Sequence, residues 1–160
     1  MPPTCPSLTQ RTTTLRKRVT SAAAAIVIVL AIVAVYEYYP RSQKVVEINL
    51  TARQWYYDAV LVKSTDPAAR ATTAKTSDTF ANTTIVVTKG DLVLINLTTA
   101  DVEHGFAISG YLEQVGLHTV RPGQSVTITF AANTRGSFIF YCTHYCGHGH
   151  SVMFGTLIVL

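Results

Sequence analysis

The chain has 160 residues, 48% of them hydrophobic, with a mean hydropathy of +0.27 and a formal net charge of +4 at pH 7. This length suffices for one domain of ordinary size plus an extension. The charge is concentrated at the start, where Arg11, Arg16, Lys17 and Arg18 occur without any acidic residue. From Arg41 onward there are nine Lys or Arg against eight Asp or Glu. Because this larger part is nearly neutral and has no basic run, the composition argues against nucleic-acid binding.

The first predicted element is an apolar helix near the N-terminus. From Val19 to Tyr36 the sequence VTSAAAAIVIVLAIVAVY holds eighteen residues without a charge, close to the length that crosses a hydrocarbon core of about 30 Å. Basic residues precede this run and tyrosines follow it. Because basic residues favour the cytoplasmic side of a membrane, we expect the N-terminus in the cytoplasm. We therefore expect a cytoplasmic basic tail over 1–18, a single membrane-spanning helix over 19–39 and an extracytoplasmic domain over 40–160.

A cleaved signal peptide is the alternative for this segment. Its basic start would fit, but the apolar run is longer than the usual signal-peptide core of about 7–15 residues. No clear small-x-small cleavage pattern precedes the tyrosines. An uncleaved anchor is the favoured interpretation.

The rest of the chain alternates short β patterns with turn signals. Val46, Ile48 and Leu50 alternate with polar residues and predict the first strand. Residues 64–83, STDPAARATTAKTSDTFANT, are polar and rich in Thr and Ala, and are predicted to form a surface loop. Further strands are predicted at 84–88, 92–98, 106–109, 125–130, 137–142 and 156–160, with turns at 89–91 and 121–124. Short strands with Gly/Pro turns every eight to twelve residues or so indicate a mainly β domain, an antiparallel sandwich or barrel.

The densest group of reactive side chains lies near the C-terminus, in FYCTHYCGHGHSVMFG from Phe140 to Gly155. Its spacing is Cys142-x3-Cys146-x3-His150-x2-Met153. Thiolate, imidazole and thioether groups are ligands for softer transition metals, and a methionine as weak axial ligand favours copper over structural zinc. Two thiolates four residues apart on one loop can bridge two copper ions.

A pair of copper ions requires more ligands than this stretch contains. Each ion needs one imidazole and one weak axial ligand; His150 supplies one imidazole and Met153 one axial sulfur. The best candidate for the second imidazole is His104, which follows a strong strand pattern. The backbone carbonyl of His144 is a candidate for the other axial position.

Other interpretations of the cluster stay open. Cys142 and Cys146 could form a disulfide in an oxidising compartment, although so short a loop is strained and the histidines would be left unexplained. A zinc site would leave Met153 unexplained. His118 and His148 are expected at the surface. Four aromatic residues are expected to form an apolar layer that keeps water from the metal: Phe106, Tyr141, Tyr145 and Phe154.

Three stretches resemble one known family. DVEHGF (101–106), RPGQ (121–124) and CTHYCGHGHSVMFG (142–155) closely resemble the dicopper (CuA) domain of cytochrome c oxidase subunit II, over about residues 84–160. The single helix and the short domain look like the B-type haem-copper oxidases. The resemblance implies a cupredoxin fold, a Greek-key sandwich or barrel, with two copper ions. It implies ligands at His104, Cys142, Cys146, His150 and Met153, with the His144 carbonyl completing the set.

Two details of the resemblance concern single residues. The segment RQWYY (53–57) is similar to the aromatic segment where the mitochondrial-type subunit receives electrons, so Trp55 is a candidate electron-receiving residue; a buried strand aromatic is the alternative. Between the two cysteines the mitochondrial-type subunit commonly has a glutamate that also binds magnesium. Here His144 stands at that position, so the magnesium role is not carried over.

The resemblance also implies a function. The chain would accept single electrons outside the membrane and pass them to haem in a larger catalytic subunit, where O₂ is reduced to water with proton movement. Its expected partners are that haem-containing subunit I, an electron donor such as cytochrome c or a small copper protein, and the lipid membrane. The alternatives are a dicopper subunit of a nitric oxide reductase, a membrane-anchored copper carrier or assembly protein, and a zinc-stabilised binding domain.

Overall fold

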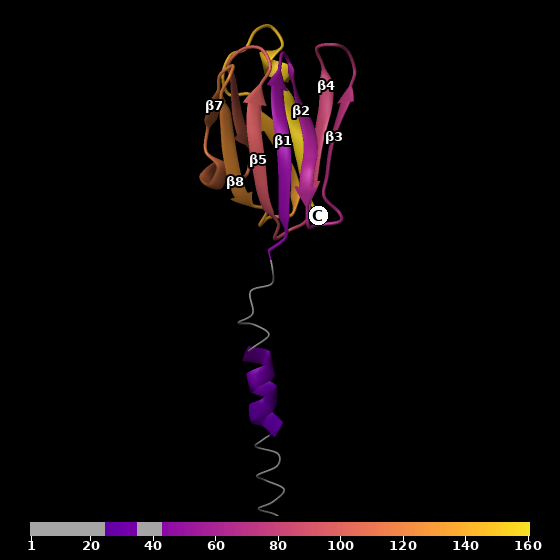
Figure 1. Ribbon diagram of the computed structural model, residues 1–160, viewed down its shortest axis with the longest axis vertical. Helices are drawn as coiled ribbons and strands as arrows, with labels where there is room; N and C mark the ends of the chain where they lie inside the picture. Colours follow the sequence, from indigo (N-terminus) through magenta and orange to yellow (C-terminus); the bar gives the residue numbers. More distant parts are fainter. Residues whose placement is uncertain (1–24, 35–42) are drawn as a thin grey trace, which may run out of the picture. The chain divides into compact units, whose positions relative to one another are not determined.

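The computed structural model describes residues 25–34 and 43–160 (Figure 1). Residues 25–34 form a helix with exposed side chains, and residues from Gln43 to Leu160 form a compact unit of their own. Within these described ranges, no helix is both long enough and apolar enough to span a bilayer. The predicted tail over 1–18, and the predicted membrane segment over 19–39 apart from 25–34, lie outside the described residues.

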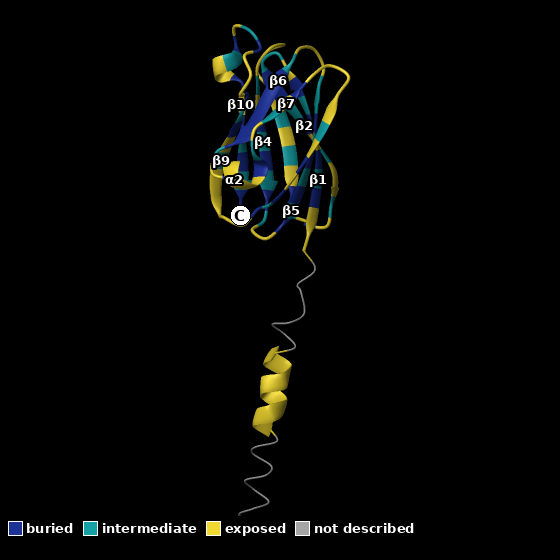
Figure 2. Ribbon diagram, turned by 90° about the vertical axis from the view of Figure 1, so that its left-hand side faces the viewer, coloured by how far each residue is buried: buried dark blue, intermediate teal, exposed yellow. Residues whose placement is uncertain are grey.

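The compact unit is a sandwich of two β-sheets. One sheet has four strands in the order β2-β1-β5-β8, and the other has six in the order β3-β4-β10-β9-β6-β7 (Figures 1 and 2). The elements are β1 (Val45–Arg53), β2 (Tyr56–Ser64), β3 (Arg70–Lys75), β4 (Ala81–Val87), β5 (Leu92–Thr99), β6 (His104–Ile108), α2 (Leu112–Val115), β7 (His118–Val120), β8 (Ser125–Ala131), β9 (Gly136–Tyr141), the 3₁₀ turn η1 (His150–Val152) and β10 (Phe154–Val159).

Period-2 patterns build this sandwich, because alternate side chains of a strand point to opposite faces of its sheet. Val46, Ile48 and Leu50 are fully buried, as predicted for the first strand, and Ile95 and Leu97 on β5 lie beside Ile48 and Leu50 in register. Each such side chain stabilises the fold by about 1.5–3 kcal/mol. The prediction of a mainly β sandwich is confirmed.

Two pairings differ from the expected antiparallel arrangement. β1 pairs in parallel with β5, and β10 pairs in parallel with β4. In each case the chain between the two paired strands contributes strands to the other sheet. Parallel and antiparallel strands share the same side-chain alternation, so the pattern of apolar residues does not distinguish them.

The predicted surface loop over 64–83 is wrong. Arg70–Lys75 form the edge strand β3, which pairs antiparallel with β4 from Arg70↔Val86 to Lys75↔Ala81. One face is exposed, and on the other face Ala71 and Thr73 are only half-buried. With alanine and threonine at these positions, the segment lacks the apolar alternation that marks a half-buried strand. Its threonines favour extended backbone, and the Thr73 hydroxyl accepts a hydrogen bond from the Ala59 N–H at 2.9 Å.

Aromatic rings fill the core between β2, β6 and β9. Tyr57, Phe106 and Phe140 are fully buried, with ring centroids 5.5–5.9 Å apart. Edge-on and tilted contacts at these separations are favourable for aromatic rings. Phe106 lies two residues after His104 and Phe140 two residues before Cys142, so this cluster fixes the backbone next to both segments.

Candidate metal centre

The candidate ligands come from two segments that the sheet brings together. His104 is the first residue of β6, and Cys142 directly follows β9; Ala107 on β6 lies opposite Tyr141 on β9. Tyr141 also pairs with Phe154 on β10, next to Met153. The loop between β9 and β10 therefore lies beside the start of β6, at one end of the sandwich (Figures 1 and 2).

Each cysteine sulfur lies near one imidazole and one weaker donor. Cys142 Sγ is 3.9 Å from His104 Nδ1 and 3.0 Å from the His144 carbonyl oxygen. Cys146 Sγ is 3.8 Å from His150 Nδ1 and 3.7 Å from Met153 Sδ. The two sulfurs are 3.8 Å apart. The site thus has two neighbouring sulfurs, each with its own imidazole nitrogen and its own weaker donor.

Most of these side chains are shielded from solvent. His104, Cys142, Cys146 and Met153 are buried, while His150 is half-buried. Both cysteines are free, and their separation of 3.8 Å is far above the S–S bond length of about 2.05 Å. Cys142 and Cys146 therefore do not form a disulfide in this structure.

The buried sulfurs differ in their ease of ionisation. Burial opposes ionisation of Cys142, but hydrogen bonds with the His104 ring and the Gly105 N–H lower the pKa of this thiol to about 6. Burial, followed by the negative charge on Cys142, raises the pKa of Cys146 to about 12. Without metal, ionisation of Cys142 therefore opposes ionisation of Cys146. A divalent or monovalent soft cation is what would allow both thiols to ionise together.

Asp101 orients the first imidazole. Its Oδ1 lies 2.8 Å from His104 Nε2 and accepts a hydrogen bond from the Val102 N–H. Burial alone would lower the pKa of His104, but the hydrogen bonds with Cys142 and Asp101 raise it above its ordinary value. With Nε2 held by the carboxylate, Nδ1 faces the sulfur pair, an arrangement found around metal-binding histidines.

Further residues around the centre are not visible as metal-site residues from the sequence. The Gln54 side-chain amide and the Trp55 indole N–H both donate to the Cys146 carbonyl, at 2.6 and 3.2 Å. The Tyr57 hydroxyl donates to the Gly105 carbonyl at 2.6 Å. None of these three side chains is a candidate metal ligand. Of this segment the sequence singled out only Trp55, as a candidate electron-receiving residue.

The expected apolar layer is only partly present. Phe106 is fully buried and Tyr141 half-buried, but Tyr145 is 71% exposed and Phe154 46% exposed. The prediction that these two rings are buried around the metal is therefore wrong: the Phe154 side chain is on the outer face of its sheet. The exposed Tyr145 ring does contact the His150 ring, with centroids 5.7 Å apart. His148 is exposed as expected, and His118 is half-buried, with Nε2 2.6 Å from the Val115 carbonyl.

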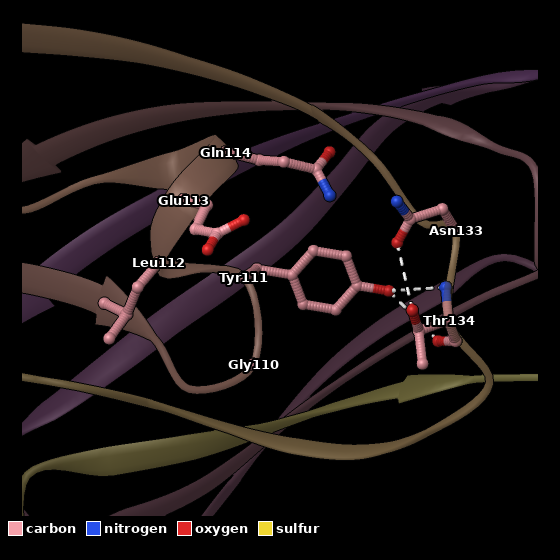
Figure 3. Close-up of a pocket in the computed structure, with 7 residues that line it drawn as sticks. All are labelled: Gly110, Tyr111, Leu112, Glu113, Gln114, Asn133 and Thr134. Atoms are coloured by element: carbon pink, nitrogen blue, oxygen red, sulfur yellow. Dashed lines mark hydrogen bonds between the residues drawn. The ribbon is translucent and has the colours of Figure 1, made fainter.

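A polar hollow of about 390 Å³ lies elsewhere, beside α2 (Figure 3). The Tyr111 hydroxyl crosses it to the backbone of Thr134, donating to the carbonyl at 3.0 Å and accepting from the N–H at 3.2 Å. None of the candidate metal ligands lines this hollow. It is a feature separate from the metal centre.

Comparison with known proteins places this site in a family context. The family model described as cytochrome c oxidase subunit II, periplasmic domain, matches residues 46–159. Cytochrome c oxidase subunit 2 of Thermus thermophilus is 36% identical over 75 residues, which cover 47% of this chain and 53% of the relative. Nitrous-oxide reductase of Cupriavidus necator is 39% identical over 75 residues, 44% of this chain and 11% of the reductase. The chain spans about half the length of the first curated relatives it matches.

Solved structures share the fold. The periplasmic domain of subunit II of cytochrome oxidase of Bradyrhizobium japonicum superimposes with a TM-score of 0.55 at 24% identity, covering 72% of this chain and 83% of that one. A chain of a heme-copper terminal oxidase dimer gives 0.55 at 21% identity, with 90% and 99% covered. Because the family match extends over residues 46–159, most of the chain, this protein belongs to the family of the cytochrome c oxidase subunit II periplasmic domain.

Proposed function

We propose that this chain is the electron-accepting subunit of a terminal haem-copper oxidase, with two copper ions held between β6 and the β9–β10 loop. The observation that carries the proposal is the paired donor set: two sulfurs 3.8 Å apart, each with its own imidazole nitrogen and its own weak donor. A single metal ion would need only one of these sets. Two soft thiolates, two imidazoles and a thioether suit copper.

The proposed ligands divide into three kinds. Cys142 and Cys146 would be shared by both ions, and His104 and His150 would each serve one. Met153 and the His144 carbonyl would be the weak donors, beside Cys146 and Cys142 respectively. Copper held by these residues would supply reversible one-electron chemistry.

The surrounding residues prepare the site for electron transfer. Burial of His104, both cysteines and Met153 keeps water from the ligand atoms. Asp101 holds the His104 ring, and the Gly105 N–H lies 3.4 Å from Cys142 Sγ, where it stabilises negative charge on the sulfur. A site whose ligands are fixed before and after reduction needs little rearrangement when an electron arrives or leaves.

The indole of Trp55 is the proposed point where electrons arrive. It is half-buried, and its N–H donates to the carbonyl of Cys146, one of the two sulfur ligands. An electron reaching the indole therefore has a short route through one hydrogen bond and the Cys146 backbone. The donor would be a cytochrome c or a small copper protein docking on this side of the domain.

The remaining parts of the proposal concern the whole assembly. The domain over 40–160 would lie outside the membrane, carried by a helix over 19–39, with the tail over 1–18 in the cytoplasm. Electrons would pass to haem in a larger subunit I, where O₂ is reduced to water and protons are moved. The heme-copper terminal oxidase whose chain shares this fold supports such an assembly.

Electron paramagnetic resonance of the copper-loaded chain tests the copper pair. One unpaired electron shared equally by two copper nuclei gives a seven-line hyperfine pattern, whereas one copper gives four lines. We expect seven lines from the unmutated chain and their loss in Cys146→Ser, since serine cannot bridge soft ions. A four-line spectrum from the unmutated chain, or a colourless protein that binds only zinc, would refute the proposal.

A further inference from the structure

The turn between β1 and β2 contacts both ligand-bearing segments. The Gln54 backbone N–H donates to Asp101 Oδ2 at 2.8 Å, and Oδ1 of the same carboxylate lies 2.8 Å from His104 Nε2. The Gln54 side-chain amide donates to the Cys146 carbonyl at 2.6 Å. One residue is thus connected to the His104 segment through its backbone and to the cysteine loop through its side chain.

The chemistry of this contact fixes the orientation of the amide. The Cys146 carbonyl is only an acceptor, so the NH₂ group of Gln54 must face it rather than the amide oxygen. The Trp55 indole N–H donates to the same carbonyl at 3.2 Å. Two donors from neighbouring residues therefore share one carbonyl, that of a proposed metal ligand.

Two glycines in the cysteine loop make room for this turn. A Cβ added to Gly147 would lie 3.0 Å from Gln54 Nε2, and one added to Gly149 would lie 2.5 Å from the Trp55 ring. Gly147 also has φ +117°, a conformation that residues with side chains rarely adopt. The loop is thus shaped to let Gln54 and Trp55 reach the backbone beside Cys146.

We propose that Gln54 is a positioning residue of the metal centre, which holds the His104 segment and the Cys146 loop at a fixed separation. The inference rests on the proposed metal function and names a residue that supplies no ligand atom. Without the amide donor, the loop carrying Cys146 and His150 loses a 2.6 Å hydrogen bond to the turn that also contacts Asp101. The expected consequence is a less well-defined separation between the two sulfur–imidazole pairs.

Substitution of Gln54 by methionine in the full chain tests this role. Methionine keeps the length of the side chain and the backbone N–H but removes the donor. We expect the chelator concentration that removes half of the copper to fall about 10–100-fold, the range typical for loss of a group that orients metal ligands. We also expect the seven-line pattern to broaden or change its splitting. The matched control is Gln114→Met on α2, away from the proposed ligands, which should change neither measurement.

Gln54→Glu separates hydrogen bonding from packing. Glutamate has the shape of glutamine, but at neutral pH its carboxylate would face the Cys146 carbonyl without a proton to donate. We expect this variant to retain copper no better than Gln54→Met. Wild-type copper retention and spectra in either variant would overturn the positioning role. A loss of thermal stability with unchanged spectra and retention would likewise show that Gln54 acts only in folding.

Cobalt binding keeps this test separate from the test of the copper pair. Co²⁺ gives visible thiolate charge-transfer bands when it binds cysteine, so it reports on the same cluster without requiring two copper ions. If the unmutated chain lacks the seven-line pattern, the proposed function fails. The Co²⁺ affinity of Gln54→Met relative to the unmutated chain then still decides the inference: a loss of tenfold or more supports it, and equal affinities overturn it.

Discussion

Gly105 shows how closely the two ligand-bearing segments approach. A Cβ at this position would lie 2.1 Å from Thr143 Oγ1 and 2.5 Å from the His144 backbone nitrogen. Gly105→Ala should therefore push the cysteine loop away from β6, at a cost of about 1–3 kcal/mol in the free energy of unfolding. Because His104 is the adjacent residue, the copper spectrum should also be lost or altered. Chemical denaturation and electron paramagnetic resonance of the same sample measure both effects.

Gly123→Ala is the matched control for this substitution. Gly123 has φ +81° with open space around it, so alanine there meets only backbone strain of about 1–2 kcal/mol. We expect a stability loss with an unchanged copper spectrum. If Gly105→Ala kept the wild-type spectrum, the close approach of the two segments would not be needed for metal binding.

The candidate donor residues could be recognised in the sequence, whereas the residues that hold them in place could not. Cys142, Cys146, His150 and Met153 are recognisable because thiol, imidazole and thioether side chains at close spacing have few other joint uses. His104 was reachable only through the fold and the family resemblance, since it lies 38 positions before Cys142. Gln54 has ordinary chemistry, and its role depends on a backbone carbonyl 92 positions away. Hydrogen bonds of that kind leave no pattern in one sequence.

The Tyr57 hydroxyl links strand β2 to strand β6 across the sandwich. Tyr57 is fully buried, and its hydroxyl donates to the Gly105 carbonyl at 2.6 Å. Tyr57→Phe keeps the ring packing but leaves this carbonyl without its partner, which should lower the free energy of unfolding by about 1–3 kcal/mol. Denaturant titration measures the change. Tyr56→Phe is the control, because nothing in residues 43–160 forms a hydrogen bond with the Tyr56 hydroxyl; its stability should change by less than about 0.5 kcal/mol.

Asp66 and Asp91 are buried carboxylates, the first in the loop between β2 and β3 and the second in the turn between β4 and β5. Asp66 accepts hydrogen bonds from Lys44 Nζ at 3.1 Å and Thr88 Oγ1 at 2.7 Å, and Asp91 accepts one from the Thr88 N–H at 2.8 Å. Burial opposes ionisation of Asp66, but these donors lower its pKa below 3.8. Burial and the charge of Asp66 raise the pKa of Asp91 above 3.8 despite the Thr88 N–H.

The opposite shifts give stability a defined pH dependence. As pH falls below 3.8 through the lowered pKa of Asp66, the stabilisation from its ionised form is lost. As pH rises from 3.8 through the raised pKa of Asp91, the native state must release a proton it binds more tightly than the unfolded chain does, so stability declines. Asp91→Asn keeps the acceptor for the Thr88 N–H and can donate to Asp66. We expect a higher Tm than wild type at pH 7 and little gain at pH 3.5; equal Tm values at pH 7 would contradict this account.

Strand β3 shows why an element was missed although β4, the strand it pairs with, was predicted. Central strands such as β1 and β5 bury one or both faces, so apolar residues mark every second position. β3 is an edge strand with one exposed face and one face that is only half-buried, so this constraint is weaker and Arg70–Lys75 read as a polar loop. Its strand conformation is set by pairing with β4, a tertiary contact that local propensity does not determine.

Across the whole chain, basic and apolar residues are concentrated in the N-terminal part. Four basic residues precede the apolar run at 19–36, whereas the part from Arg41 onward is close to neutral. The domain over 43–160 has its own core and carries all the candidate ligands. A membrane anchor would therefore serve to hold this domain at a surface.

Cys5 provides a natural probe for the predicted orientation. If residues 1–18 lie in the cytoplasm, a membrane-impermeant maleimide should label Cys5 only after cells are permeabilised. A cysteine introduced by Lys63→Cys, at an exposed position of β2, should react in intact spheroplasts. Cys142 and Cys146 are 6% and 4% exposed, and the Cys5→Ser chain measures their background. Labelling of Cys5 in intact cells would reverse the orientation. A mature chain whose mass lacks residues 1–39 would instead establish a cleaved signal peptide, and the domain would then need another route to its membrane partner.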